Sequence, residues 1–270
     1  MPLLLCAFLL LIVGCSTKTQ GEKEKEVVSK PTEKTVKQEK HKTSKNNKKN
    51  TKSKEQPKYK INEANWSIEP IEKDTNEKVV LLTIDDAPDR YAVEMAKTLK
   101  DLKVPAIFFV NGHFLETAAD EENLKEIYNM GFDIGNHTYS HKSLPDLTKA
   151  EQEDEILKVN QKVERTIGYK PSFFRAPFGQ NTDVSKHIVK QENMHLMNWT
   201  FGYDWEPEYQ SKDALLEVTL NNEFLNNGSN ILMHDREWTN AALKEIVKGL
   251  DKQGYTFVDP KEIKGYSKTN

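Results

Sequence analysis

The region from residue 59 to residue 270 predicts an α/β fold built on parallel strands. Short apolar runs alternate there with longer amphipathic stretches, and such alternation indicates an α/β layer or barrel. Residues that can carry chemistry follow several of the apolar runs directly. In a parallel barrel the carboxyl ends of the strands share one face, which is where active sites lie. The two observations together predict a barrel with one functional rim.

The expected elements are read in chain order from these two kinds of segment. The strands are the short apolar runs, at 79–84, 106–110, 132–135, 172–175, 196–200, 230–234 and 255–258. The helices are the amphipathic stretches between them, at 90–100, 120–129, 148–167, 183–192, 212–225 and 239–253. The ends of the third helix are marked, because Thr148 and Glu151 form a capping box and Gly168 provides a stop.

Residues 1–14 have the features of a signal peptide. The apolar segment Leu3–Val13 is shorter than the roughly 20 residues that cross a bilayer, and its length suits a secretory h-region. It leads into Ile12-Val13-Gly14-Cys15, which resembles a bacterial lipobox. We therefore expect lipidation of Cys15, which would anchor the protein on the extracellular face of a bacterial cell membrane. The alternative is an ordinary signal peptide followed by an incidental cysteine.

Residues 15–58 are expected to form a disordered tether between the lipid and the domain at 59–270. From residue 16 to residue 58 the 14 lysines exceed the 6 glutamates by 8, and there are no aromatic residues. Because the whole chain carries −3, residues 59–270 carry −11. The tether could lie against anionic lipid or a teichoic-type polymer, or it could be a plain solvated linker.

The cysteine content and the charge exclude two features. Cys6 would leave with the signal peptide, so the mature chain would hold one acylated cysteine and no internal disulfide. An exported chain with an acidic folded part is not expected to bind nucleic acid. We expect a monomer.

Two motifs about fifty residues apart predict a metal site. Asp85 and Asp86 close the first apolar run, and His137 and His141 stand four positions apart after the third. Two imidazoles and a carboxylate suit a borderline divalent ion such as zinc, and a catalytic site keeps one position open for water. Adjacent carboxylates after a strand point in different directions, so the second can serve as a base. Taken singly, such an Asp pair is more often a turn or a helix cap, and histidines are common on surfaces.

Candidate functional residues stand at or just after the expected strand ends. These residues are Asp85, Asp86, His137, Arg175, Trp199 and His234. Their shared position at one rim of a parallel barrel raises the weight of each motif.

Four segments carry a resemblance to a known family. They are Thr83-Ile84-Asp85-Asp86-Ala87-Pro88, His137-Thr138-Tyr139-Ser140-His141, Arg175-Ala176-Pro177-Phe178-Gly179 and Ile231-Leu232-Met233-His234-Asp235. With them the chain resembles the NodB-like polysaccharide deacetylases, carbohydrate esterase family 4, over about residues 78–260. The resemblance implies a distorted (β/α) barrel and a metal-dependent deacetylase.

The resemblance also implies a role for each matching residue. Asp85 is the general base, and the metal ligands are Asp86, His137 and His141. Arg175 orients Asp85 and keeps it ionised.

Other matching residues are implied to act on the substrate. Pro177 and Phe178 form part of the substrate-binding loop, in which the Phe178 N–H helps to hold the oxyanion. His234 is the general acid that protonates the leaving amine. The alternative for His234 is a histidine that faces the core from its strand.

The chain departs from the family pattern at two places. Where the family commonly carries Asp-x-x-Asp-Trp, this chain keeps only Asp204-Trp205, and Ala87 stands where the family has glycine. Asp204 is still expected to hold His234 protonated, and Trp205 to form an apolar wall for the acetyl methyl. The departures leave the shape of the groove and the range of substrates open.

The implied reaction is the hydrolysis of an N-acetyl amide on a glycan polymer, with one divalent ion as cofactor. Zinc is the expected ion, with cobalt, nickel and manganese as alternatives. The expected substrate is N-acetylglucosamine in peptidoglycan; N-acetylmuramic acid, poly-N-acetylglucosamine, chitin fragments and acetylated xylan stay open. Two other classes of function are a non-catalytic glycan-binding lipoprotein and a hydrolase of a small free amide.

Overall fold

The computed structural model describes residues 56–266. The expected signal peptide, Cys15 and almost all of the expected tether lie outside the described residues. Within 56–266, no helix combines the length and the apolar composition that crossing a membrane requires.

The main sheet contains seven strands, and every pairing in it is parallel, as the alternating sequence predicts. The long central strand, β3 (Val79–Ala87), pairs with β9 (Thr256–Phe257) through its first two residues and with β4 (Ile107–Val110) farther along. In spatial order the strands are β7 (His195–Leu196), β6 (Phe173–Phe174), β5 (Asp133–Asn136), β4 (Ile107–Val110), β3 (Val79–Ala87) and β8 (Ser229–His234), with β9 (Thr256–Phe257) beside β3.

The segment after β7 closes the curled sheet into a distorted barrel. β7 pairs with β6, but the chain then crosses to the far edge of the sheet and pairs with β8. The Thr200 N–H donates to the Asn230 carbonyl oxygen at 2.9 Å, and the Leu232 N–H donates to the Phe201 carbonyl oxygen at 2.9 Å. This crossing explains why the strand expected at 196–200 ends early, at Leu196.

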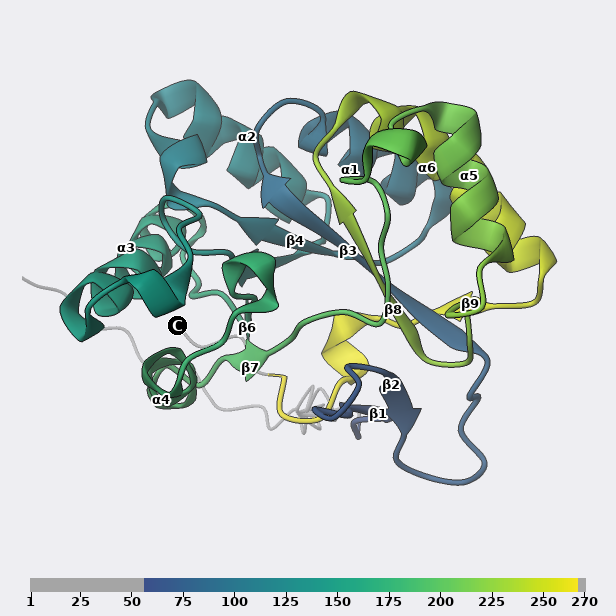
Figure 1. The fold of residues 1–270 in the computed structure, drawn as a ribbon, viewed down its shortest axis with the longest axis horizontal. Helices are drawn as coiled ribbons and strands as arrows, with labels where there is room; N and C mark the ends of the chain where they lie inside the picture. The colour runs from purple at the N-terminus through teal and green to yellow at the C-terminus, as the bar shows by residue number, and fades with distance from the viewer. Residues whose placement is uncertain (1–55, 267–270) are drawn as a thin grey trace, which may run out of the picture. The chain divides into compact units, whose positions relative to one another are not determined.

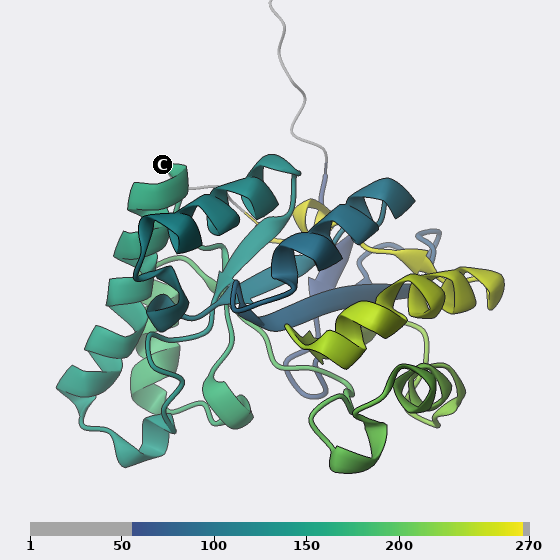
Figure 2. The same cartoon turned by 90° about the horizontal axis from the view of Figure 1, so that it is seen from above.

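Within residues 56–266, six α-helices pack around the sheet or against one another. In Figure 1 four of them, α1, α2, α5 and α6, lie above the sheet, and Figure 2 shows the same helices from above. Their bounds are α1 (Ala92–Leu102), α2 (Ala118–Asn129), α3 (Lys149–Ile167), α4 (Asp183–Gln191), α5 (Lys212–Asn221) and α6 (Glu237–Lys252).

All seven expected strands and all six expected helices are present, with ends that shift by at most four residues. The capping box of α3 is confirmed, since the Glu151 N–H donates to the Thr148 hydroxyl at 3.3 Å and the Glu151 carboxylate accepts from the Thr148 N–H at 2.8 Å. Gly168 ends this helix in the left-handed region, at φ 78°. The local chemistry of the termini therefore fixes α3 as expected.

β3 is buried on both faces, and its alternate residues pack into two different clusters. Val80 and Leu82 belong to the large cluster shared with α1 and α6. Val79 and Leu81 belong to a second cluster, which includes Phe109. This double burial makes β3 a rigid base for the residues at its carboxyl end.

A short hairpin was not expected from the sequence. β1 (Tyr59–Ile61) and β2 (Ile68–Pro70) pair antiparallel, and they lie below the sheet in Figure 1. Tyr59 and Ile68 are buried in the same cluster as the inner residues of β3. Three-residue strands of mixed polarity give too short an alternation to predict a strand from sequence.

Candidate active site

A β-bulge at the end of β3 turns two consecutive carboxylates toward one histidine. The pairing with β4 gains one residue on β3 between Ile84 and Ala87, and bulges of this kind re-aim side chains. Asp86 adopts a left-handed φ of 60°, which is rare for a residue with a side chain. As a result, Asp85 Oδ2 lies 3.4 Å and Asp86 Oδ1 3.9 Å from His137 Nε2. The divergent directions expected for a regular strand are therefore wrong, because the bulge interrupts the alternation.

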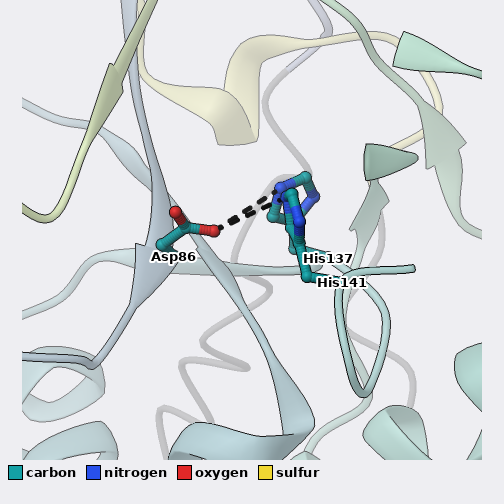
Figure 3. Close-up of side chains that lie close together, drawn as sticks. All are labelled: Asp86, His137 and His141. Atoms are coloured by element: carbon teal, nitrogen blue, oxygen red, sulfur yellow. Dashed lines mark ion pairs between the residues drawn. The ribbon is translucent and has the colours of Figure 1, made fainter. Parts of the chain in front are cut away.

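Asp86, His137 and His141 converge on one point (Figure 3). One ligand atom from each lies within 4.8 Å of the others, and Asp86 Oδ1 is 3.8 Å from His141 Nε2. Burial alone would raise the pKa of Asp86, but the surrounding histidines, His137 first, and Arg236 lower it, which keeps the carboxylate ionised. A carboxylate and two imidazoles that face one point fit a divalent ion such as zinc.

The imidazole of His137 is held in the tautomer that a ligand needs. Its Nδ1 lies 2.8 Å from the Arg175 carbonyl oxygen, which can only accept, so Nδ1 donates and Nε2 is free to bind an ion. Burial is the main cause that lowers the pKa of His141. The lowered pKa favours a neutral His141 imidazole with an available lone pair.

The loop that carries both histidines is tied down by residues outside the sequence motifs. Asn111 Nδ2 donates to the His137 carbonyl oxygen at 2.5 Å. Glu155 of α3 accepts from the Ser140 N–H at 2.8 Å and from the Ser140 hydroxyl at 2.5 Å. His141 has a left-handed φ of 56°, and such a conformation persists only where the surroundings hold it.

Arg236 binds the second oxygen of Asp86. Its Nη2 donates to Asp86 Oδ2 at 2.6 Å, while its Nη1 donates to the Asp235 carbonyl oxygen at 2.8 Å. Because Oδ2 is occupied, Oδ1 is the oxygen that faces the imidazoles. Sequence reasoning missed Arg236, since no spacing rule marks a single arginine at the start of a helix.

Arg175 lies fully buried beneath the pocket and holds Asp85. Its Nη1 donates to Asp85 Oδ1 at 2.6 Å and to the Thr83 hydroxyl at 2.9 Å. Its other nitrogens donate to two backbone carbonyls of the segment after β7, at 3.1 and 2.8 Å. A buried guanidinium that is paired and hydrogen-bonded through all three of its nitrogens keeps its carboxylate partner in one orientation. Asp85 Oδ2 is left to face the pocket.

In the same pocket, Asp204 holds His234 through two hydrogen bonds. Asp204 Oδ1 accepts from His234 Nδ1 at 2.7 Å, and Oδ2 accepts from the His234 N–H at 2.6 Å and from the Thr239 hydroxyl at 2.7 Å. Burial would lower the pKa of His234, but the charge and hydrogen bond of Asp204 raise it to about 9. Burial would raise the pKa of Asp204, but His234 lowers it. The pair is therefore an imidazolium and a carboxylate at neutral pH.

The three candidate metal ligands, Asp85 and the Asp204–His234 pair line one pocket of about 520 Å³, which has aromatic side chains at its rim. Phe178 is 62% exposed, and its ring centroid lies 5.0 Å from that of His141. Trp205 is 40% exposed, with its ring 5.6 Å from that of His234 and 6.2 Å from that of Trp199. Large exposed aromatic residues beside a polar pocket mark a binding surface.

The structure brings together most of the residues singled out from the sequence. Arg175 supports the pocket from beneath, Pro177 is buried at the start of the turn η3 (Pro177–Gly179), and Cys15 lies outside the described residues. Four lining residues were given no role from the sequence: Gln210, Arg236 and Trp238 belong to none of the quoted motifs, and Leu232 stands within the motif at 231–235 without an assigned role. Those anticipated are Asp85, Asp86, His137, His141, Phe178, Trp199, Asp204, Trp205 and His234.

Known proteins resemble this chain in sequence and in fold. The profile of the polysaccharide deacetylase family matches residues 72–197. A Bacillus cereus protein named peptidoglycan-N-acetylglucosamine deacetylase is 33% identical over 191 residues, which are 68% of this chain and 67% of that protein. The solved structure of the Bc1960 peptidoglycan N-acetylglucosamine deacetylase, 30% identical, superposes with a TM-score of 0.64 over 72% of this chain and 92% of that one.

Another solved structure adds a contrast. BA3943 from Bacillus anthracis, described as a pseudoenzyme of carbohydrate esterase family 4, is 28% identical, with a TM-score of 0.62 over 69% of this chain and 65% of that one. Its fold agrees with the barrel described above. The Bacillus cereus relative is 33% identical to this chain over two thirds of the length of each protein. The chain therefore belongs to the polysaccharide deacetylase family, carbohydrate esterase family 4.

Proposed function

We propose that this protein removes N-acetyl groups from a cell-surface polysaccharide, foremost from N-acetylglucosamine residues of peptidoglycan, and releases acetate. The observation that carries the proposal is the meeting of three kinds of group in one pocket: a metal-ligand set, a base held by a buried arginine, and a protonated histidine. Amide hydrolysis needs these three functions together. The names of the two deacetylase relatives support the choice of substrate.

In the proposed reaction Asp85 takes the proton of the attacking water. Its Oδ2 is the available oxygen, because Arg175 occupies Oδ1. A divalent ion bound by Asp86, His137 and His141 would polarise the acetyl carbonyl and lower the pKa of water.

His234 completes the proton transfers on the other side of the substrate. Its raised pKa, about 9, makes the imidazolium the starting form at neutral pH. As the C–N bond breaks, His234 gives this proton to nitrogen, so that the amine leaves and acetate remains. The charge of Asp204 stabilises the imidazolium until that step.

The rim of the pocket favours a polymer over a small free amide. Phe178 and Trp205 remain exposed, where they can contact the rings of a long sugar chain. An acetyl group enters the pocket between them, with Trp205 as the apolar wall for its methyl group. Zinc is the ion proposed for the site, with cobalt, nickel and manganese as alternatives.

The place of action proposed for the domain is the outer face of a bacterial cell membrane. The lipobox-like segment before Cys15 and the excess of lysine over glutamate after it support a lipid anchor and a basic tether. Removal of residues 16–50 with the lipid kept should reduce association with the wall. Unchanged association would show that the tether is only a linker.

The decisive experiment measures acetate release from N-acetylglucosamine oligomers and from intact peptidoglycan by the purified protein. Release should stop with a chelator and return when single divalent metals are added back, whereas an Asp85→Asn variant should bind metal and release no acetate. If the wild-type protein binds both metal and glycan and releases no acetate from any acetylated glycan, it is a binding protein, and the proposal fails.

A further inference from the structure

A second cleft, of about 860 Å³, lies between the β1–β2 hairpin and α4. Its walls come from the hairpin, the end of η3, α4, the segment around β7 and the chain near residue 264. None of the expected metal ligands or acid–base residues lines it. The cleft is therefore a separate surface that the proposed reaction does not use.

The cleft is basic although the domain is acidic. Glu63 is the one acidic residue among those that line it, whereas residues 59–270 carry −11 overall. Lys60 pairs with Glu69 at 3.3 Å, but within residues 56–266 the other three lysines have no carboxylate within 4.0 Å. The lining lysines are Lys60, Lys186, Lys190 and Lys264, and all four are exposed. Unpaired cations gathered in a cleft attract anions.

The cleft and the candidate active site share a thin wall. Phe178 lines the active site, and its neighbour Gly179 lines the cleft. Likewise, Trp199 lines the active site, and its neighbour Asn198 lines the cleft. The two segments pack tightly, because a Cβ at Gly179 would lie 3.1 Å from the Asn198 side chain and 3.2 Å from that of Trp199. Only the segments at 178–179 and 198–199 separate the two sites, so a polymer bound in the active site can extend into the cleft.

The cleft also offers groups that suit a polar ligand. Asn181 Oδ1 is buried and has no hydrogen-bond partner within the described part of the chain, although its Nδ2 donates to Asn198 Oδ1 at 3.1 Å. Half-buried Trp66 adds an aromatic surface from the hairpin. An unmatched acceptor and an aromatic face next to lysines fit a ligand with amide or hydroxyl donors beside its negative charge.

We propose that this cleft binds the carboxylate-bearing peptide substituents of peptidoglycan while a sugar of the same strand occupies the candidate active site. The peptides combine backbone amide donors with free carboxylates, which are the two features that the cleft matches. This inference rests on the proposed function, because it assumes that the polymer enters the neighbouring pocket. It makes the cleft a determinant of substrate choice.

The test reverses the charge of Lys186 and Lys190, which are exposed one turn apart on α4. The double variant K186E/K190E is compared with K244E/K248E, which makes the same change at the same spacing on exposed positions of α6. Binding of the full chain is measured with a chelator present, so that no turnover occurs. The ligands are peptide-bearing glycan fragments, the same glycans after removal of the peptides, and a phosphate-rich teichoic polymer.

We expect K186E/K190E to bind the peptide-bearing fragments about tenfold more weakly, with the loss shrinking as salt is added. Binding of peptide-free glycans should stay within about twofold of wild type, and K244E/K248E should match wild type with every ligand. Equal binding by K186E/K190E and wild type, equal losses in the two double variants, or a loss confined to the phosphate polymer would each overturn the proposal. Because binding is measured without turnover, a failure to release acetate would refute the proposed function without deciding this one.

Discussion

The Nδ1 atom of His137 donates to the backbone carbonyl oxygen of Arg175 at 2.8 Å, while the guanidinium of that arginine donates to Asp85 at 2.6 Å. One residue thus orients an expected metal ligand through its backbone and the expected base through its side chain. The two functions are separable by mutation, because a substitution removes the guanidinium and leaves the carbonyl.

Replacement of Arg175 with Met should therefore impair catalysis more than metal binding. The change leaves Asp85 buried without its partner, so we expect the free energy of unfolding to fall by about 3–5 kcal/mol and kcat/KM to fall at least about 100-fold. Metal content, measured by elemental analysis of the folded protein, should stay near that of wild type. Arg175→Lys restores the charge and should recover part of the stability; loss of metal in both variants would contradict the separation.

Replacement of Asp86 with Ala should abolish metal uptake and acetate release together. The variant removes the single carboxylate oxygen that lies near both imidazoles, and two imidazoles alone bind a divalent ion weakly. Isothermal titration with zinc and an acetate assay measure the two losses. Asp101→Ala, at an exposed position of α1, is the control. Activity that survives in Asp86→Ala would refute the assigned ligand set.

Arg236→Gln should weaken metal binding without removing it. Arg236 fixes Asp86 Oδ2 at 2.6 Å, and loss of a group that orients a ligand typically lowers metal affinity about 10- to 100-fold. We expect kcat to return close to wild type when the metal is saturating. Arg90→Gln is the matched control, because Arg90 is exposed and pairs only loosely with Asp89, at 3.7 Å. An unchanged zinc affinity in Arg236→Gln would show that Asp86 needs no such support.

Asp204→Asn should lower the pKa of His234 from about 9 toward its ordinary value. The charged pair stabilises the folded state fully below pH 6.5, and its contribution disappears as the pH rises through about 9. The rise of the His234 pKa from 6.5 to about 9 corresponds to about 3 kcal/mol of stabilisation. The low pKa of Asp204 sets the other limit, since the pair is also lost when acid protonates that carboxylate.

The variant should accordingly lose more free energy of unfolding near pH 6 than near pH 10. NMR titration of the His234 imidazole in the metal-free protein gives the pKa directly. The alkaline limb of the kcat/KM profile should move to lower pH in Asp204→Asn. A His234 pKa that stays near 9 in the variant would mean that Asp204 is not the cause of the shift.

The sequence predicted the elements better than it predicted the directions of side chains. The apolar run at 79–84 and the capping box at Thr148 are local signals, and the structure contains both elements. The convergence of Asp86 with His137 and His141 agrees with their placement at strand ends. The bulge that turns Asp86 depends on the pairing of β3 with β4, and Arg236 reaches Asp86 across 150 residues of chain. Such features arise from tertiary contacts, which produce no periodic pattern in the sequence.

The barrel closes through contacts between segments that are far apart in the chain. Thr83 on β3 donates its hydroxyl proton to the carbonyl oxygen of Ile231 on β8 across 148 positions, and the base and the acid stand just beyond these two residues. The segment around Asp85 and the segment around His234 each hold only part of the set of groups that line the pocket. Folding must bring the two halves together before any activity exists, and such long-range pairing is slow. We therefore expect a single cut between Thr83 and Ile231 to abolish acetate release once the two pieces separate.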